Sequence, residues 1–403
     1  MKVAYLTIED ITSGLFKTQI LDILEEISNF DNTINFKIYI LNRPWLYFQH
    51  RFYLNEYRAK YNSNKITFCY IPLLPPLRNS LKYFFYSLLV TKWLALIFKL
   101  FINRNKFDLI HARSYWPTFT VLNKNIPIIF DLRSLWLLEN ISTGEIKLNS
   151  RSYNYWKQVE IDCINKSAVS TCVSSAMVDY VVNISAFAKT ALIPISVNEK
   201  YFNFDQKNRI KNRQILEWNE NVIFVYSGSL GQSGINIKSI TKLFKSIIDV
   251  NDIHRILIIT SEQNLYVKEI MAKIGIDHTK YKIIHPKLNE ISSWLDSSDF
   301  GLHALPKQLD SKTRLGTKVV EYWINGLPVI INKNVGAAAD YIDKYNVGYV
   351  VEDDLGEYVL KEKVYEMLNY DRNYISNFAK YFFSAKVISL QYLKLYQDSI
   401  KNN

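Results

Sequence analysis

Four cationic side chains gather around the start of a short predicted helix in the last third of the chain. They are Lys307, Lys312, Arg314 and Lys318. A helix start already carries about half a positive charge, so each cation there costs roughly 0.3–1 kcal/mol unless an anion compensates it. Backbone N–H groups at a helix start, together with Lys or Arg, suit a phosphate or diphosphate. The segment therefore predicts an anion site.

Glu321 follows one helical turn later, where a carboxylate cannot serve the phosphate. Its expected use is to accept hydrogen bonds from sugar hydroxyls beside that phosphate. We therefore interpret Lys318 and Glu321 as a clamp for a nucleoside-diphosphate sugar, with Ser311, Lys312 and Thr317 also binding this donor. The alternative is a solvated loop that leads into an ordinary core helix, because short motifs give false positives.

The residues around these side chains predict a helix and then a buried strand. Thr317 is the expected N-cap, and Gly326 supplies the left-handed residue that ends the helix. Pro328 prevents continuation, and residues 329–331 form the strand.

Strand, glycine turn and helix patterns occur at the start of each half of the chain. Residues 2–7 and 222–227 are the strands. In a Rossmann-type unit such a turn brings backbone N–H groups close to a phosphate-bearing ligand, although most lone turn glycines are merely turns. The resulting donor-binding candidates are Ser13, Gly14, Gly228, Ser229 and Gly231.

Polar residues also follow two buried-type strands in the first half. His111 ends one of them, and residues 126–130 deliver Asp131 and Arg133, with Glu139 nearby. Ligands bind at the carboxyl ends of strands in open α/β sheets. We therefore expect catalytic roles for His111 and Asp131 and acceptor contacts for Arg133 and Glu139. The alternatives are a structural histidine and an internal ion pair.

Length and composition fit a globular α/β enzyme. The chain has 403 residues, more than one core usually fills, so two domains are expected. Its three cysteines lack a metal-ligand spacing, which predicts neither disulfides nor a metal site. Residues 2–7 are soon followed by Glu9 and Asp10, which predicts no signal peptide and a cytoplasmic protein.

The net charge of +11 calls for an anionic partner. The candidates are nucleic acid, an anionic membrane surface and phosphorylated substrates. Nucleic acid is the weakest, because no zinc-finger, RNP or helix-turn-helix signature accompanies the charge. We expect no nucleic-acid partner.

Residues 77–107 are apolar, aromatic and basic. The uninterrupted apolar runs fall short of the roughly 20 residues that a membrane span needs. Such a stretch suits the surface of an anionic bilayer, whereas the alternative is a packed helix with snorkelling lysines. Its cations are Arg78, Lys82, Lys92, Lys99, Arg104 and Lys106.

Three motifs resemble the retaining glycosyltransferases of family 4. The run Ser-x-x-Arg-x-x-Thr-Lys-x-x-Glu-Tyr-x-x-x-Gly-x-Pro-Val-Ile at 311–330 resembles their donor-binding segment. The family usually has two glutamates eight positions apart, and here Thr313 replaces the first. Asp-x-x-His-Ala at 108–112 and Asp-Leu-Arg-Ser-Leu-Trp at 131–136 are similar to two further family motifs.

The resemblance implies an α/β protein of the GT-B fold, with two Rossmann-like domains facing a central cleft. Residues 1–203, joined by a C-terminal helix at about 386–403, would bind the acceptor, and residues 204–385 the donor. It implies a retaining hexosyltransferase that moves a sugar from a nucleoside-diphosphate sugar to a glycan or lipid-linked acceptor in bacterial surface polysaccharide synthesis.

In this interpretation Arg314 and Lys318 hold the departing diphosphate, and neither a cofactor nor a metal is required. Many relatives use membrane-borne acceptors, so a peripheral position on the inner face of the plasma membrane is expected, with 77–107 as the contact. Two alternatives stay open: a sugar-nucleotide epimerase of the same fold, and a non-catalytic polyanion- or membrane-binding protein.

Overall fold

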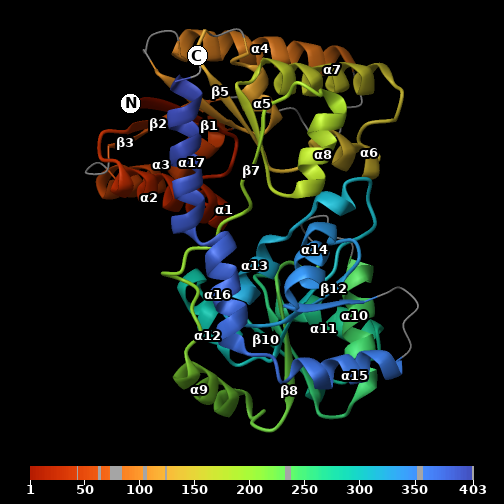
Figure 1. Cartoon of the computed structure of the whole chain (residues 1–403). Coiled ribbons are helices and arrows are strands. Elements are labelled where there is room, and N and C mark those ends of the chain that lie inside the picture. The colour runs from red at the N-terminus through yellow and green to blue at the C-terminus, as the bar shows by residue number, and fades with distance from the viewer. Residues whose placement is uncertain are drawn as a thin grey trace. The chain divides into compact units, whose positions relative to one another are not determined.

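The computed structural model describes residues 1–42, 44–61, 65–72, 84–102, 107–122, 125–231, 237–351 and 357–401. The chain divides into two compact units (Figure 1). The first combines Met1–Pro194 with Ala385–Asn403, and the second is Ile195–Ser384. The sequence-based expectation had placed these boundaries at 203/204 and about 385/386.

The first unit is built on a seven-stranded parallel sheet with the order β3-β2-β1-β4-β5-β6-β7. Every residue of β4 and β5 is buried, as expected for central strands covered by helices on both faces. The strands are β1 Lys2–Thr7, β2 Asn35–Asn42, β3 Ile66–Pro72, β4 Leu109–Arg113, β5 Ile128–Leu132, β6 Val169–Cys172 and β7 Thr190–Leu192.

Most helices of the first unit connect its successive strands. Ser13, Ser150 and Ser174 each accept a backbone N–H bond at the start of α1, α7 and α8, so their side chains set where these helices begin. The helices are α1 Gly14–Phe16, α2 Asp22–Phe30, α3 Pro44–Tyr61, α4 Phe84–Ile102, α5 Tyr115–Phe119, α6 Trp136–Ser142, α7 Arg151–Lys166 and α8 Ser175–Ile184.

The last helix of the chain, α17 (Ala385–Lys401), belongs to the first unit and packs against α2 (Figure 1). Its residues Ile388, Tyr392 and Tyr396 are buried in the same hydrophobic cluster as β1 and β2. The core of this unit is therefore completed by residues from both ends of the sequence.

The second unit is built on a six-stranded parallel sheet with the order β10-β9-β8-β11-β12-β13. The strands are β8 Val222–Ser227, β9 His254–Ile259, β10 Tyr281–Ile284, β11 Phe300–His303, β12 Val329–Asn332 and β13 Gly348–Val351. The helices are α9 Gln206–Leu216, α10 Ile237–Val250, α11 Asn264–Lys273, α12 Ile291–Asp296, α13 Thr317–Ile324, α14 Gly336–Tyr345, α15 Glu357–Met367 and α16 Arg372–Phe383.

Two hydrophobic clusters fill the second unit. One gathers around Trp323 of α13 and Phe378 of α16, and the other around Phe244 of α10. The predicted α/β class with two parallel Rossmann-like sheets is confirmed.

One local prediction is wrong. Thr317 is not the N-cap of α13 but its first residue, and Gly316 takes the cap position at φ 76°. The reason is steric, since this left-handed backbone conformation favours glycine.

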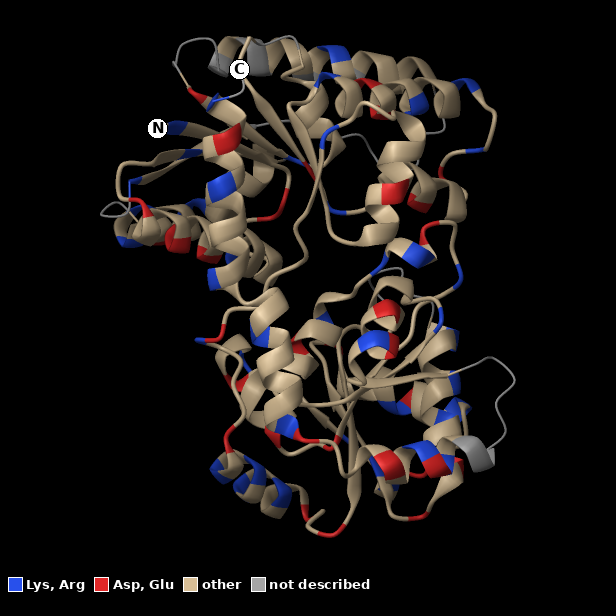
Figure 2. Ribbon diagram, viewed as in Figure 1, with Lys and Arg blue, Asp and Glu red and all other residues tan. Residues whose placement is uncertain are grey.

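Charged residues are distributed over both units (Figure 2). Among the described helices, none has both the length and the apolar character that crossing a membrane requires. Of the predicted membrane segment 77–107, residues 84–102 form α4, and residues 77–83 and 103–106 lie outside the described part of the chain.

Gly301 of β11 provides a test of the packing in the second unit. A Cβ atom on Gly301 would lie 2.3 Å from Cδ2 of Tyr322, whose ring is fully buried. The ring cannot move freely, because the Tyr322 hydroxyl accepts a hydrogen bond from the Ser227 N–H at 2.7 Å. We expect Gly301→Ala to destabilise the protein by about 1–3 kcal/mol or more in urea unfolding. Gly14→Ala, which meets open space, is the control; equal unfolding midpoints would contradict this account.

Candidate functional site

The start of α13 carries the side chains that the sequence singled out. A 3₁₀ turn, Ser311–Thr313, precedes the helix, and no side chain caps its first N–H groups. Lys307 and Lys312 are exposed, whereas Arg314 and Lys318 are partly buried. An uncapped helix start with cations around it retains its attraction for an anion.

Arg314 already has an anionic partner. Its Nε lies 2.8 Å from Oδ2 of Asp310, whose side chain is buried, and its guanidinium also donates to Gln308. The sequence analysis missed Asp310, although a carboxylate four residues before an arginine is the signal that could have revealed it. Arg314 is therefore fixed in place, with part of its charge compensated.

Lys318 and Glu321 contact one another directly. Lys318 Nζ lies 2.8 Å from Oε2 of Glu321. Glu321 is mostly buried, whereas Lys318 is about a third exposed. Because they are three residues apart on one helix, both side chains project from the same face. A ligand with phosphate and hydroxyl groups can replace this pair by binding both residues.

His303, at the end of β11, lies beneath the loop that leads into α13. A Cβ on Gly316 would meet its Nε2 at 3.0 Å. The residue is partly exposed, but its Nδ1 is buried and has no hydrogen-bond partner within the described residues. Burial, assisted by Lys318 and Arg314, lowers the pKa of His303 to about 4. The sequence analysis gave His303 no role, although the strand-end rule applied to His111 would have found it.

The glycine turn after β8 is held by a buried carboxylate that the sequence analysis also missed. Glu262 accepts the hydroxyl hydrogen bond of Ser229 and the N–H of Leu230, the latter at 2.9 Å. The Gly228 N–H donates to the Ile259 carbonyl oxygen. These donors are therefore engaged within the protein, and a diphosphate would have to displace Glu262 to use the first two.

The remaining glycine-turn candidates have structural positions. Gly231 adopts φ 139°, and a Cβ there would lie 2.8 Å from the Tyr266 hydroxyl oxygen. In the first unit, Ser13 caps α1 by accepting from the Phe16 N–H, and Gly14 is the first residue of that helix.

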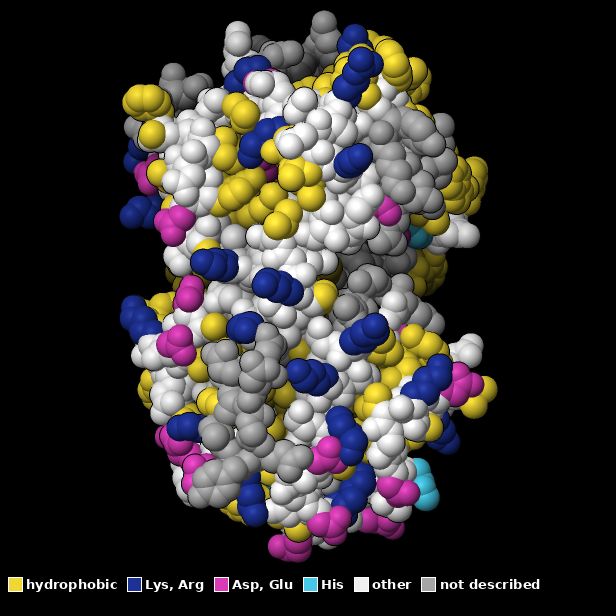
Figure 3. All heavy atoms as spheres, turned by 90° about the vertical axis from the view of Figure 1, so that its right-hand side faces the viewer, with side chains coloured by type: hydrophobic (Ala, Val, Ile, Leu, Met, Phe, Trp, Pro, Cys, Tyr) yellow, Lys and Arg dark blue, Asp and Glu magenta, His cyan; other side chains and the backbone are white. Residues whose placement is uncertain are grey.

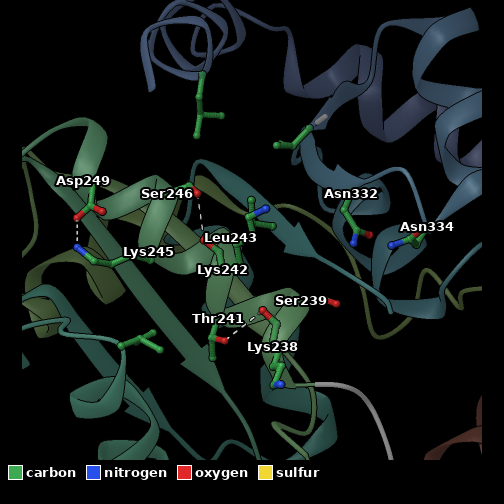
Figure 4. A pocket seen from close by; sticks show the side chains of 13 residues that line it. Lys238, Ser239, Thr241, Lys242, Leu243, Lys245, Ser246, Asp249, Asn332 and Asn334 are labelled. Carbon is green, nitrogen blue, oxygen red and sulfur yellow. Dashed lines mark hydrogen bonds and ion pairs between the residues drawn. The ribbon is translucent and has the colours of Figure 1, made fainter. Parts of the chain in front are cut away.

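A cavity of about 570 Å³ lies along α10 (Figure 4). Lys238, Lys242 and Lys245 line it together with Asn332, the last residue of β12, and Asn334, which follows that strand. Lys245 pairs with Asp249, and both asparagines donate to the Leu305 carbonyl oxygen. None of the residues predicted to bind the donor lines this cavity.

Asp131 is the centre of a buried polar network in the first unit. Its Oδ1 accepts from the Thr171 hydroxyl at 2.8 Å and from the Tyr392 hydroxyl at 2.9 Å. Its Oδ2 accepts from Arg133 Nε at 3.0 Å and Arg113 Nη1 at 3.2 Å. Although burial opposes ionisation, Arg133, His111 and Arg113 hold the pKa of Asp131 well below its usual range.

His111 joins this network. Its Nε2 lies 3.4 Å from Oδ2 of Asp131, and its Nδ1 lies 2.7 Å from the Tyr396 hydroxyl. The ring is 2% exposed, and burial lowers the pKa of His111, which favours its neutral form. The structure thus brings His111, Asp131 and Arg133 together as a closed internal cluster. Their roles toward a substrate stay predictions, as does that of Glu139, which accepts from the Ser134 hydroxyl.

Known proteins resemble this chain in structure. Sucrose-phosphate synthase from Thermosynechococcus elongatus matches with a TM-score of 0.69 and 12% identity over 100% of both chains. HepE from Anabaena, solved with UDP-glucose, matches with a TM-score of 0.67 and 13% identity over 99% of this chain and 100% of HepE. WaaG, a glycosyltransferase involved in lipopolysaccharide biosynthesis, matches with a TM-score of 0.62 and 12% identity over 99% of each chain.

No family model matches the sequence, and neither does any curated protein. At 12–13% identity the structural matches establish the fold alone. The chain has the GT-B fold, an α/β architecture with two parallel Rossmann-like sheets.

The Asp131 network gives a prediction about stability. Asp131→Asn keeps the shape but removes the charge of the buried carboxylate that Arg113 and Arg133 share, which should cost about 3–5 kcal/mol in urea unfolding. Tyr392→Phe removes one hydroxyl, which donates to this carboxylate and accepts from Arg133 Nη2 at 3.1 Å, and should cost about 1–2 kcal/mol. Equal losses for the two variants would contradict a charge-centred network.

His303 gives a prediction about pH. The pKa of His303 is about 4 in the folded protein and about 6.5 in the unfolded chain. Between about pH 4 and pH 6.5, the proton on this residue is therefore bound more tightly in the unfolded chain than in the folded protein. Stability should therefore fall as the pH decreases from about 6.5 to 4, by at most about 3 kcal/mol. His303→Gln should show a smaller decrease in urea unfolding across this range. The exposed His278→Gln control should keep the wild-type decrease, and an unchanged slope in His303→Gln would refute the assignment.

Proposed function

We propose that this protein is a retaining glycosyltransferase that moves a sugar from a nucleoside-diphosphate sugar to a glycan or lipid-linked acceptor of bacterial surface polysaccharide synthesis. The observation that carries the proposal is the uncapped start of α13, where Lys318 and Glu321 form an ion pair at 2.8 Å. The GT-B fold is shared with nucleotide-sugar glycosyltransferases, which supports the reaction class.

Donor binding in this proposal is an exchange of partners. Lys318 leaves Glu321 and binds the diphosphate together with N–H groups at the start of α13, and Glu321 accepts hydrogen bonds from the sugar hydroxyls. Neither charge is left without a partner in either state, which keeps the desolvation cost of Glu321 small. Arg314, fixed by Asp310, adds a second positive charge at a defined place.

Catalysis is then mainly electrostatic. The bond between the anomeric carbon and the diphosphate oxygen breaks as the acceptor hydroxyl oxygen bonds to that carbon, and the hydroxyl proton leaves with the diphosphate. Lys318, Arg314 and the helix start stabilise the negative charge that develops on the leaving group, the contribution that is usually the largest in such sites. This scheme requires neither a metal nor a cofactor.

Donor binding can be tested by thermal unfolding in the presence of UDP-, GDP- and ADP-sugars. A ligand present at 100 times its Kd should stabilise the native state by about 2.7 kcal/mol. Stabilisation by one of these donors supports the proposal. The absence of any stabilisation, at concentrations up to the solubility of the donors, would refute it.

Variants of the ion pair test the roles of its members. Lys318→Ala should reduce transfer by about 10²–10³-fold with an unchanged fold, because leaving-group stabilisation is lost. Glu321→Ala should mainly weaken donor binding. Lys361→Ala, which removes an exposed lysine from α15 of the same unit, is the matched control.

Product analysis separates the proposal from the alternative of an epimerase. A transferase forms a glycosylated acceptor and releases the nucleoside diphosphate, whereas an epimerase converts the sugar nucleotide without an acceptor.

Near-normal transfer by both Lys318→Ala and Glu321→Ala would contradict the proposed role of this ion pair in donor binding and catalysis.

A further inference from the structure

Helix α4 exposes a row of large apolar side chains. Phe85, Leu89, Trp93, Leu96 and Leu100 are each between 51% and 73% exposed. Their spacing of three or four residues places them on one face, because each residue turns an α-helix by about 100°. At a rise of about 1.5 Å per residue, the row is roughly 22 Å long.

The opposite face of α4 packs against the rest of the first unit. Ser87 and Thr91 are buried there against α7. The Trp156 indole N–H donates to Ser87 Oγ at 3.2 Å, and the Thr91 hydroxyl bonds with that of Tyr155. An ordinary surface helix turns its apolar face inward and its polar face outward. The exposed apolar row of α4 departs from this order, so folding of the unit alone does not account for it.

The charge of this region indicates what covers the row. Residues 77–107 contain six Lys or Arg and no Asp or Glu. Of these cations, Lys92 is exposed and borders the row next to Trp93. Figure 2 shows no acidic position along the described part of α4, and Figure 3 shows hydrophobic and basic side chains close together near the upper end of the view.

We propose that α4 docks this protein onto the surface of a bilayer that contains anionic phospholipid. The outer row enters the acyl-chain boundary, and Lys92 lies among the headgroups. A convex helix face needs no shaped partner groove for this purpose, and tryptophan and lysine are suited to the interfacial region. The basic surroundings add attraction to anionic headgroups. This inference does not depend on the proposed transfer reaction.

Vesicle co-sedimentation of the full chain tests the proposal. The protein should bind vesicles of mixed phosphatidylglycerol and phosphatidylcholine, and bind pure phosphatidylcholine vesicles more weakly. The double variant Leu89→Gln with Trp93→Gln should lower the binding to the mixed vesicles by about tenfold or more. Lys92→Gln should lower it less and reduce its salt dependence.

The matched control is the double variant Leu148→Gln with Phe187→Gln. These two exposed apolar residues lie outside α4 in the same unit, so the change in overall hydrophobicity is similar. It should bind like wild type, and thermal unfolding should confirm that all variants are folded. The proposal is overturned if wild type does not bind the mixed vesicles, or if the two double variants bind equally.

Light scattering after size-exclusion chromatography tests the other possible partner of the exposed row, a second copy of the chain. A dimer that Leu89→Gln with Trp93→Gln converts to a monomer, without vesicle binding by wild type, would also overturn the proposal. A monomer that binds vesicles through α4 supports it.

Discussion

The need to neutralise buried carboxylates constrains both units. An ionised carboxylate that leaves water must find cations or hydrogen-bond donors, because its desolvation otherwise costs several kcal/mol. Asp131 meets this need with donors from β4, β6, the loop after β5 and α17. These donors come from residues between Arg113 and Tyr392, so one carboxylate joins segments that are remote in the sequence.

The same constraint decides which polar groups remain for a ligand in the second unit. Glu262 engages the Ser229 hydroxyl and the Leu230 N–H, and Asp310 engages Arg314. The Lys318 and Glu321 pair differs, because Lys318 is partly exposed and both members project from one face of α13. It is therefore the ion pair in this segment that a ligand can exchange at the smallest cost.

Local features of the sequence predicted the architecture well. Strand runs such as 222–227 and the helix after the basic loop follow from patterns within a few residues, and the structure contains both. The failures have physical causes. Thr317 was chosen as N-cap because its hydroxyl can cap, but the backbone before α13 requires a positive φ that Gly316 supplies. Glu262 and Tyr392 could not be assigned, because their partners are 33 and 261 residues away and only tertiary packing selects them.

The position of α17 has a consequence for biosynthesis. The first unit lacks the side chains of Ile388, Tyr392 and Tyr396 until the ribosome has made α17, whereas Ile195–Ser384 is continuous and is synthesised before that helix. Domains generally fold as units during synthesis, beginning with the N-terminal one. Here the order of completion is reversed, because the core of the first unit stays incomplete until α17 has been translated.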